Sequence, residues 1–572
     1  MIKTSIFGLI FLFFMFTHIS GIHSPYHQDE YKWVLYSHPE IIAPGAVPHP
    51  PLTEFIYTKV GPLVGDLNFR FIPFFFGILN FFLLFYLSKC LFGPFDKLRA
   101  SKIALWIVFL FSISFYSLLA SLMVDVDGAI MPMFFLIMSI AYFKLKRTNF
   151  SPYGGSPEGR QMWVWWALLL IGAIGGFMIK VSTVLPMAAI FLDFLIERKV
   201  FSDWKKVSKY FLYACGGAVV LALTLVLAHF IFPFFNLSYA LKYWEHFWNS
   251  SSFLNRGWFQ TFIQFFKSIL YTSPLLILPA FFADKEIFRK TRVFYIFICL
   301  GLIFYLFAFD FSIGALDRYF QFIVVPLCII SGAVFSRAFE GLLGKVKKVH
   351  IIGLILAIVL LFIVQFFPHV VPSLHPKSEW LNRILSFKWN FLYPFTGGSG
   401  PLGFYVSFLF ISLSWILSIT TTLLSTWRKN LQVMCLVFIF SIGLVYNSVF
   451  IEEYLFGFIN GSAPKVLAGA VEFIKNDSSI KSVTVYNDNG GYDIQSIGKY
   501  HKRLYTDPKF GTEAKIANLN QYKEFYLEVN VPRIDPTSFY RRYLDSCKIV
   551  YHNTDKSISA KVYDCRWAPD LK

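Results

Sequence analysis

Apolar runs close to the membrane-spanning length recur along this chain from the N-terminus to about residue 456. A helix needs about twenty apolar residues to cross a bilayer, so the sequence predicts an α-helical polytopic membrane protein. The composition agrees, because 56% of the 572 residues are hydrophobic and only 15% are charged, against about 25% in a typical soluble domain. An ordinary cytosolic enzyme does not fit these numbers. Disorder, collagen and a disulfide-rich scaffold are excluded.

Basic residues mark alternate loops between the apolar runs. The formal charge of +18 is scattered among these runs rather than gathered on one soluble face, which excludes nucleic acid as the expected partner. The positive-inside rule places the basic loops in the cytoplasm. These loops lie at residues 97–102, 144–147, 198–209, 285–292, 345–348 and 428–429. Counting through this alternation predicts about thirteen spans, with an uncleaved first span over Ile6–Ile19 and the C-terminus outside. We expect a multi-pass protein of the bacterial inner (plasma) membrane.

The pattern becomes soluble at about Gly461. We therefore predict a transmembrane domain over residues 1–460, whose first outer loop covers 23–69, and a small extracytoplasmic α/β domain over 461–572. Periodicity and turn residues predict the elements of the second domain. They are a helix over Val466–Ile474, strands over Ser482–Tyr486, Glu524–Val529 and Lys548–Tyr551, and a turn at 487–491.

The seven cysteines show no metal-ligand spacing. Five lie in or beside apolar runs, where a small core residue is the simplest interpretation. Only Cys547 and Cys565 fall in the soluble stretch. Because an extracytoplasmic compartment favours disulfides, we predict that these two are bonded.

Two apolar stretches are interrupted by charged residues. Ile103–Phe143 is broken by 124–128, which contains Asp125 and Asp127, and Trp163–Ile196 is broken by Lys180 and Pro186. Charges are costly in lipid, so these side chains should face a protein cavity or the outer water boundary. Asp127 could instead cap the following helix. Lys180 should meet an anionic lipid headgroup or a carboxylate, unless it snorkels to the surface.

The first outer loop and one later outer segment hold further candidates. Asp29 and Glu30 offer a general base or metal ligands, although a solvated acidic pair is the simpler alternative. His49, before a double proline, could contact a phosphate or a metal, or be an ordinary loop histidine. Arg318, beside Tyr319, presents a planar fork of donors that suits a phosphate.

Taken in order, these elements resemble the GT-C superfamily of polytopic glycosyltransferases. The nearest branch holds protein O-mannosyltransferases and the bacterial aminoarabinose and Rgt-type sugar transferases. The resemblance covers roughly residues 1–330. It rests on Asp29-Glu30, His49-Pro50-Pro51-Leu52, Arg70-x-x-Pro73, Asp127 before a Phe-rich helix, Lys180 after a Gly-rich helix, and Arg318-Tyr319 with Pro326 downstream.

The resemblance implies a polyprenyl-phosphate sugar donor, and a glycan, lipid or protein acceptor on the outer face. Asp29 would be the catalytic base, with Glu30 in support. His49, Lys180, Arg318 and Tyr319 would bind the donor phosphate, and Asp127 and Arg70 would support them. A divalent metal could be held by Asp29, Glu30 or Asp127. One departure stands out, since aminoarabinose transferases have Glu-Lys before the double proline and this chain has Pro48-His49.

Another class of protein also places polar residues inside spans. A transporter or a flippase for lipid-linked sugars would do so, but such folds often carry paired repeats, and the sequence has no repeat of fixed period. A scaffold with a lost active site is a third alternative. The candidates Asp29, Asp127 and Lys180 are present, which favours an enzyme.

Overall fold

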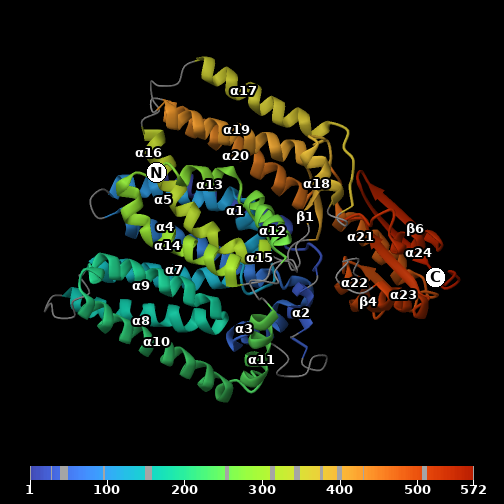
Figure 1. Cartoon of the computed structure of the whole chain (residues 1–572), viewed down its shortest axis with the longest axis horizontal. Helices are drawn as coiled ribbons and strands as arrows, with labels where there is room; N and C mark the ends of the chain where they lie inside the picture. The colour runs from blue at the N-terminus through green and yellow to red at the C-terminus, as the bar shows by residue number, and fades with distance from the viewer. Residues whose placement is uncertain are drawn as a thin grey trace. The chain divides into compact units, whose positions relative to one another are not determined.

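The protein is mainly α-helical in a computed structural model (Figure 1). The structure describes residues 2–27, 29–35, 37–38, 49–93, 97–147, 157–250, 257–308, 316–340, 348–373, 378–395, 402–428, 431–504 and 512–570. Within these ranges seven helices are long and apolar enough to cross a membrane, or nine if two bent pairs are each one span. The chain is therefore a multi-pass membrane protein. The count of about thirteen spans stays a prediction.

Two compact units divide the chain. The first comprises Met1–Ile22, Lys32–Lys345 and Asn430–Leu436, and the second comprises His23–Tyr31, Val346–Lys429 and Val437–Lys572. The predicted boundary at residue 461 stays a prediction.

Sixteen α-helices precede residue 341 in the described part of the chain. They are α1 Ile2–Gly21, α2 Asp29–Leu35, α3 Pro51–Val64, α4 Phe71–Phe92, α5 Lys97–Ile113, α6 Phe115–Leu122, α7 Ile130–Arg147, α8 Pro157–Ile179, α9 Val184–Glu197, α10 Trp204–Ile231, α11 Leu237–Ser250, α12 Trp258–Thr272, α13 Pro274–Ala280, α14 Lys285–Ile303, α15 Leu316–Tyr319 and α16 Val324–Glu340.

The helices break where the sequence places charges. No helix covers the segment between α6 and α7, which holds Asp125 and Asp127. The chain turns back closely there, since a Cβ on Gly128 would lie 2.2 Å from the carbonyl oxygen of Ala120. Lys180 is extended after α8. Pro186 does not break a helix, because it lies in the first turn of α9, where proline costs no hydrogen bond.

The second unit contains more helices and two sheets. They are α17 Lys348–Ile363, α18 Ser378–Leu385, β1 Leu392–Phe395, β2 Phe404–Ser407, α19 Phe408–Trp427, α20 Gln432–Leu455, α21 Ala463–Asn476, β3 Val483–Tyr486, α22 Gly491–Ser496, β4 Tyr500–Leu504, α23 Thr512–Gln521, β5 Phe525–Val529, α24 Phe539–Asp545, β6 Lys548–Asp555 and β7 Ile558–Asp564. Figure 1 shows α17 alongside α19, and β1 pairs antiparallel with β2.

The larger sheet confirms the predicted α/β character of the C-terminal region. Its strand order is β4-β3-β5-β7-β6, with β3 parallel to β4 and β5 and the other pairs antiparallel. One face packs on α21 through buried residues that include Val466, Leu467, Val485 and Leu527. The predicted helix and three predicted strands are present. β4 and β7 were not predicted.

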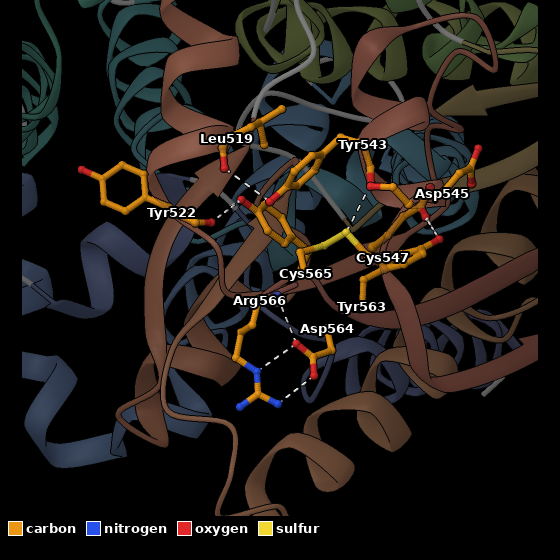
Figure 2. Close-up of a disulfide and its surroundings, with 12 residues drawn as sticks. Leu519, Tyr522, Tyr543, Asp545, Cys547, Tyr563, Asp564, Cys565 and Arg566 are labelled. Atoms are coloured by element: carbon orange, nitrogen blue, oxygen red, sulfur yellow. Dashed lines mark hydrogen bonds and ion pairs between the residues drawn. A yellow bond between two sulfur atoms is a disulfide. The ribbon is translucent and has the colours of Figure 1, made fainter. Parts of the chain in front are cut away.

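A disulfide joins Cys547 to Cys565, as predicted from their place in the soluble stretch. Figure 2 shows the bond between the end of α24 and the end of β7. Two residues of the neighbourhood form an ion pair, with Nη2 of Arg566 2.7 Å from Oδ2 of Asp564. The bond ties the last strand to the helix that precedes β6.

Candidate functional site

Four charged side chains and a tyrosine meet in the first unit, and we call Asp125, Asp127, Lys180, Arg318 and Tyr319 the Asp127 cluster. Nζ of Lys180 lies 2.6 Å from both carboxylate oxygens of Asp127. Nη1 of Arg318 lies 2.9 Å from Oδ2 of Asp125, and its Nε lies 3.7 Å from Oδ2 of Asp127. The structure thus brings together three segments that the sequence suggested separately.

Aromatic rings complete the cluster. Nη2 of Arg318 donates a hydrogen bond of 2.8 Å to the hydroxyl of Tyr319. Nζ of Lys180 lies 4.2 Å from the centroid of the same ring, a distance at which a cation is attracted to the ring face. Tyr305 stacks on Tyr319, with centroids 5.7 Å apart. Both cations are therefore oriented by one ring.

The cluster is buried and electrically balanced. The side chains of Asp125 and Asp127 are 3% and 5% exposed, and those of Lys180 and Arg318 are 12% and 13% exposed. Two carboxylates face two cations, so the formal charge cancels. An unpaired charge at this depth would cost several kcal/mol, and mutual pairing removes that cost. Lys180 and Arg318 are therefore fixed in place, and both side chains carry N–H donors that suit a phosphate.

The backbone of the cluster is held by side chains of α3 and by Arg70. The hydroxyl of Tyr57 donates to the carbonyl of Asp125 at 3.1 Å, and that of Thr53 donates to the carbonyl of Ile179 at 3.2 Å. Nη1 of the buried Arg70 donates to the carbonyl of Leu122 at 2.7 Å. These carbonyls lie at helix breaks and lack an intrahelical partner. Arg70 therefore supports the loop that carries Asp125 and Asp127.

Glu54 is a residue that the sequence did not single out. It is 7% exposed, and its Oε2 has no hydrogen-bond partner among the described residues. Burial raises the pKa of this carboxyl to about 7. Glu54 shares a face of α3 with Tyr57, because residues three apart lie together on a helix. Only this spacing from Tyr57 could have indicated it.

His49 is linked to the same region through aromatic rings. Its ring stacks on that of Trp33 with centroids 5.9 Å apart, and Trp33 lies 5.2 Å from Tyr57. Tyr57 in turn holds the backbone of Asp125. The rings place His49 in an ordered environment at the start of α3, as the double proline that follows it suggested.

Asp29 and Glu30 belong to the second unit and are described by themselves. α2 begins at Asp29, whose side chain lies outside the described part of the chain. Glu30 is 1% exposed. Its Oε2 accepts a 3.0 Å hydrogen bond from the backbone N–H of His27, and its own N–H donates to the carbonyl of His27 at 3.0 Å. This reciprocal pattern resembles a capping box, so Glu30 has a structural contact in its own loop.

The carboxylates near Lys180 do not form a metal site as they stand. Both oxygens of Asp127 are bonded to Lys180. In the described ranges no group of three or more His, Cys, Asp or Glu side chains could hold a metal ion. A metal at Asp127 would have to displace the ammonium group. The hypothesis of a divalent metal at Asp29, Glu30 or Asp127 stays a prediction.

Comparison with known proteins identifies the fold of the chain. No family model and no curated protein matches the chain. The crystal structure of ArnT from Cupriavidus metallidurans bound to undecaprenyl phosphate does match, with a TM-score of 0.53 and 11% identity over 97% of this chain and 98% of that one. The chain has the fold of ArnT. Apo ArnT from the same organism gives a TM-score of 0.51 and 12% identity over the same shares. The likeness to ArnT therefore extends through both units.

Proposed function

We propose that this protein is a membrane glycosyltransferase that transfers a hexosyl or pentosyl group from a polyprenyl-phosphate donor to a glycan, lipid or protein acceptor. The observation that carries the proposal is the Asp127 cluster, in which Lys180 and Arg318 are buried, paired and oriented. The fold supports it, because ArnT, which has that fold, was crystallised with undecaprenyl phosphate.

Lys180, Arg318 and Tyr319 are assigned to the donor phosphate, together with His49. A phosphate leaving group gains negative charge as its bond to the sugar breaks. Fixed cations stabilise that charge more than they stabilise the bound donor, which lowers the barrier. Asp127 and Asp125 keep the cations in position, and Arg70 keeps the loop of the two aspartates in position.

The proposed reaction is a single displacement. The acceptor hydroxyl oxygen forms a bond to the anomeric carbon of the sugar while the bond from that carbon to the phosphate oxygen breaks. The electron pair of the broken bond stays on the phosphate oxygen, and the hydroxyl proton passes to Asp29. Glu30 supports Asp29 by fixing the start of α2 through its contact with His27. The resemblance to GT-C enzymes implies inversion at the anomeric carbon.

The proposal also assigns sidedness and layout. The loop at 23–69 and the region after residue 461 are assigned to the outer face, in a layout of about thirteen spans. A sugar other than aminoarabinose is favoured, because Pro48-His49 replaces the Glu-Lys pair before the double proline.

A turnover assay on purified protein separates an enzyme from a transporter. The protein is placed in liposomes with a radiolabelled polyprenyl-phosphate sugar and a cell-envelope extract as acceptor source. The enzyme should release polyprenyl phosphate and transfer the label to an acceptor. A flippase would move the intact donor across the bilayer and release none, and that outcome would contradict the proposal.

A further inference from the structure

The segment before α2 is docked on the C-terminal sheet domain, and both belong to the second unit. His27 forms an antiparallel bridge with Asn489. Its Nε2 lies 3.2 Å from the carbonyl oxygen of Asn487. His27 is fully buried and Tyr26 is 4% exposed, so this part of the loop is covered rather than free in solvent.

The turn that receives His27 has an unusual backbone. Asn487 and Asp488 have φ angles of 51° and 60°, in the left-handed region that few residues other than glycine adopt. Asn and Asp tolerate it best. The side-chain Nδ2 of Asn489 anchors the turn by donating a 2.9 Å hydrogen bond to the carbonyl of Val531. Asn487 and Asp488 therefore adopt a rarely populated backbone conformation at the turn that contacts His27.

The same turn carries a buried carboxylate. Asp488 is fully buried and accepts a 3.1 Å hydrogen bond from the hydroxyl of Tyr500. Nη1 of Arg503 lies 3.8 Å from the same carboxylate. Burial together with the charge of Asp488 raises the pKa of Tyr31 to about 12. Asp488 therefore ties the turn to β4, which contains Tyr500 and Arg503.

A ring contact adds to the same surface. Tyr26 meets Tyr492 edge to face with centroids 5.0 Å apart. Tyr26 and His27, which precede Asp29 and Glu30, are therefore both held by one segment of the C-terminal domain, which runs from Asn487 to Arg503.

We propose that the 487–503 segment is a positioning device for the Asp29–Glu30 pair, and that it acts through its contacts with His27 and Tyr26. The inference rests on the proposed function for its catalytic consequence, but the docking itself does not. A general base must be held within hydrogen-bond reach of its proton, and a short loop cannot fix a side chain without outside contacts. The C-terminal domain supplies those contacts through side chains that do not touch the reacting atoms.

The test uses two variants of the full chain, His27→Phe and Tyr492→Leu. The first removes the contact of His27 Nε2 with the carbonyl of Asn487 and keeps an aromatic ring, and the second removes the ring contact with Tyr26. Loss of one such contact shifts a local opening equilibrium by about two- to tenfold. Hydrogen exchange of backbone amides over residues 23–35 should accelerate by that factor. Turnover should fall by about tenfold or more while donor binding stays within about twofold, since misplaced catalytic groups lower kcat rather than ground-state binding.

Tyr543→Phe is the matched control. It removes a buried tyrosine hydroxyl of the same domain, which donates to the carbonyl of Leu519 at 3.3 Å, away from the docked loop. It should lower the melting temperature slightly and leave turnover and exchange over 23–35 unchanged.

The outcomes separate the two proposals. Unchanged exchange over residues 23–35 in both variants would overturn the docking, whatever the activity. Faster exchange with unchanged turnover of an active enzyme would overturn the positioning role. If the wild-type chain transfers no sugar, the proposed function fails, and the exchange measurement alone still decides the docking.

Discussion

Lys180 and Asp127 lie 53 positions apart in the sequence, yet the ammonium nitrogen of Lys180 lies 2.6 Å from both carboxylate oxygens of Asp127. The two charged interruptions of the apolar pattern therefore form one ion pair. A buried ammonium and a buried carboxylate each need a partner of opposite charge, and here each supplies the other's. Arg318 extends the pairing to a third segment, with its Nη1 2.9 Å from Asp125.

Donor binding should depend on Lys180. In the proposed site, Lys180→Ala would remove a charge-assisted contact to the donor phosphate and should weaken binding of undecaprenyl phosphate by about ten- to a hundredfold. Lys180→Arg should restore part of the affinity, because the charge survives while the geometry changes. Binding is measured by a change in tryptophan fluorescence or by native mass spectrometry.

Lys146→Ala is the matched control for this measurement. Lys146 also pairs with a buried carboxylate, Asp193, at 3.2 Å, but at the end of α7 that is assigned to the cytoplasm. Its loss should affect stability and leave affinity for the lipid unchanged. Equal weakening by Lys146→Ala and Lys180→Ala would show a general loss of structure and no phosphate site at Lys180.

The stability of the Lys180–Asp127 pair should be strongly non-additive. Lys180→Met leaves Asp127 with only its longer contact to Arg318 at 3.7 Å, and Asp127→Asn removes the carboxylate that pairs with Lys180. Loss of a buried ion-pair partner costs about 3–5 kcal/mol. The double variant removes both charges and should lose much less than the sum of the two single changes. Unfolding in detergent, followed by circular dichroism, gives the coupling. An additive double variant would mean that the two side chains do not interact in the folded protein.

Much of the architecture was predictable because the physical signals are local. Apolar length predicts spans, and a charge within an apolar run predicts a break. The break at Lys180 was identified correctly. Pro186 was misjudged, because its effect depends on whether it falls in the first turn of the following helix. The pairing of Cys547 with Cys565 followed from elimination of the cysteines near apolar runs.

Other features depend on contacts that no local pattern carries. β4 has the sequence YHKRL, with no regular apolar alternation, and is a strand only because β3 pairs with it. Glu54 is buried by the packing of α3. The partner of Lys180 could be limited to a carboxylate or an anionic lipid, but the choice of Asp127 needed the tertiary fold. The docking of His27 on Asn489 joins residues more than 460 positions apart and had no signal in the sequence.

Glu54 should make stability depend on pH. Its pKa is about 7 in the folded protein against an ordinary value of 4.5. Below 4.5 both states are protonated and its effect on stability is nil. Between about 4.5 and 7 the unfolded chain releases a proton that the folded chain keeps, so the free energy of unfolding falls as pH rises. Above pH 7 the free energy of unfolding has fallen by the full amount that Glu54 causes.

Glu54→Gln should remove this loss. Its melting temperature relative to that of the wild type should rise as pH increases from about 5 to 7, and then level off. Glu472→Gln, which changes an exposed glutamate on α21, should show no such trend. A difference between Glu54→Gln and wild type that stays constant from pH 5 to 8 would mean that the carboxyl titrates normally.

Sidedness can be tested with cysteines at exposed positions. Lys59 on α3 and Lys205 on α10 are both exposed, and the positive-inside rule assigns them to opposite sides. In a background where the exposed Cys215 and Cys299 are serine, a membrane-impermeant maleimide added to intact cells should label Lys59→Cys and not Lys205→Cys. Labelling with the opposite pattern would invert the topology.

The central claim is that this chain breaks and forms a glycosidic bond with Asp29 as the base. The most direct measurement is turnover beside donor binding for Asp29→Asn, which keeps the shape of the side chain and removes its ability to accept a proton. Turnover should fall by about 10²–10⁴-fold, while undecaprenyl phosphate binding stays within about twofold of wild type. Turnover and donor binding that fall in the same proportion, or turnover that does not fall, would contradict the assignment.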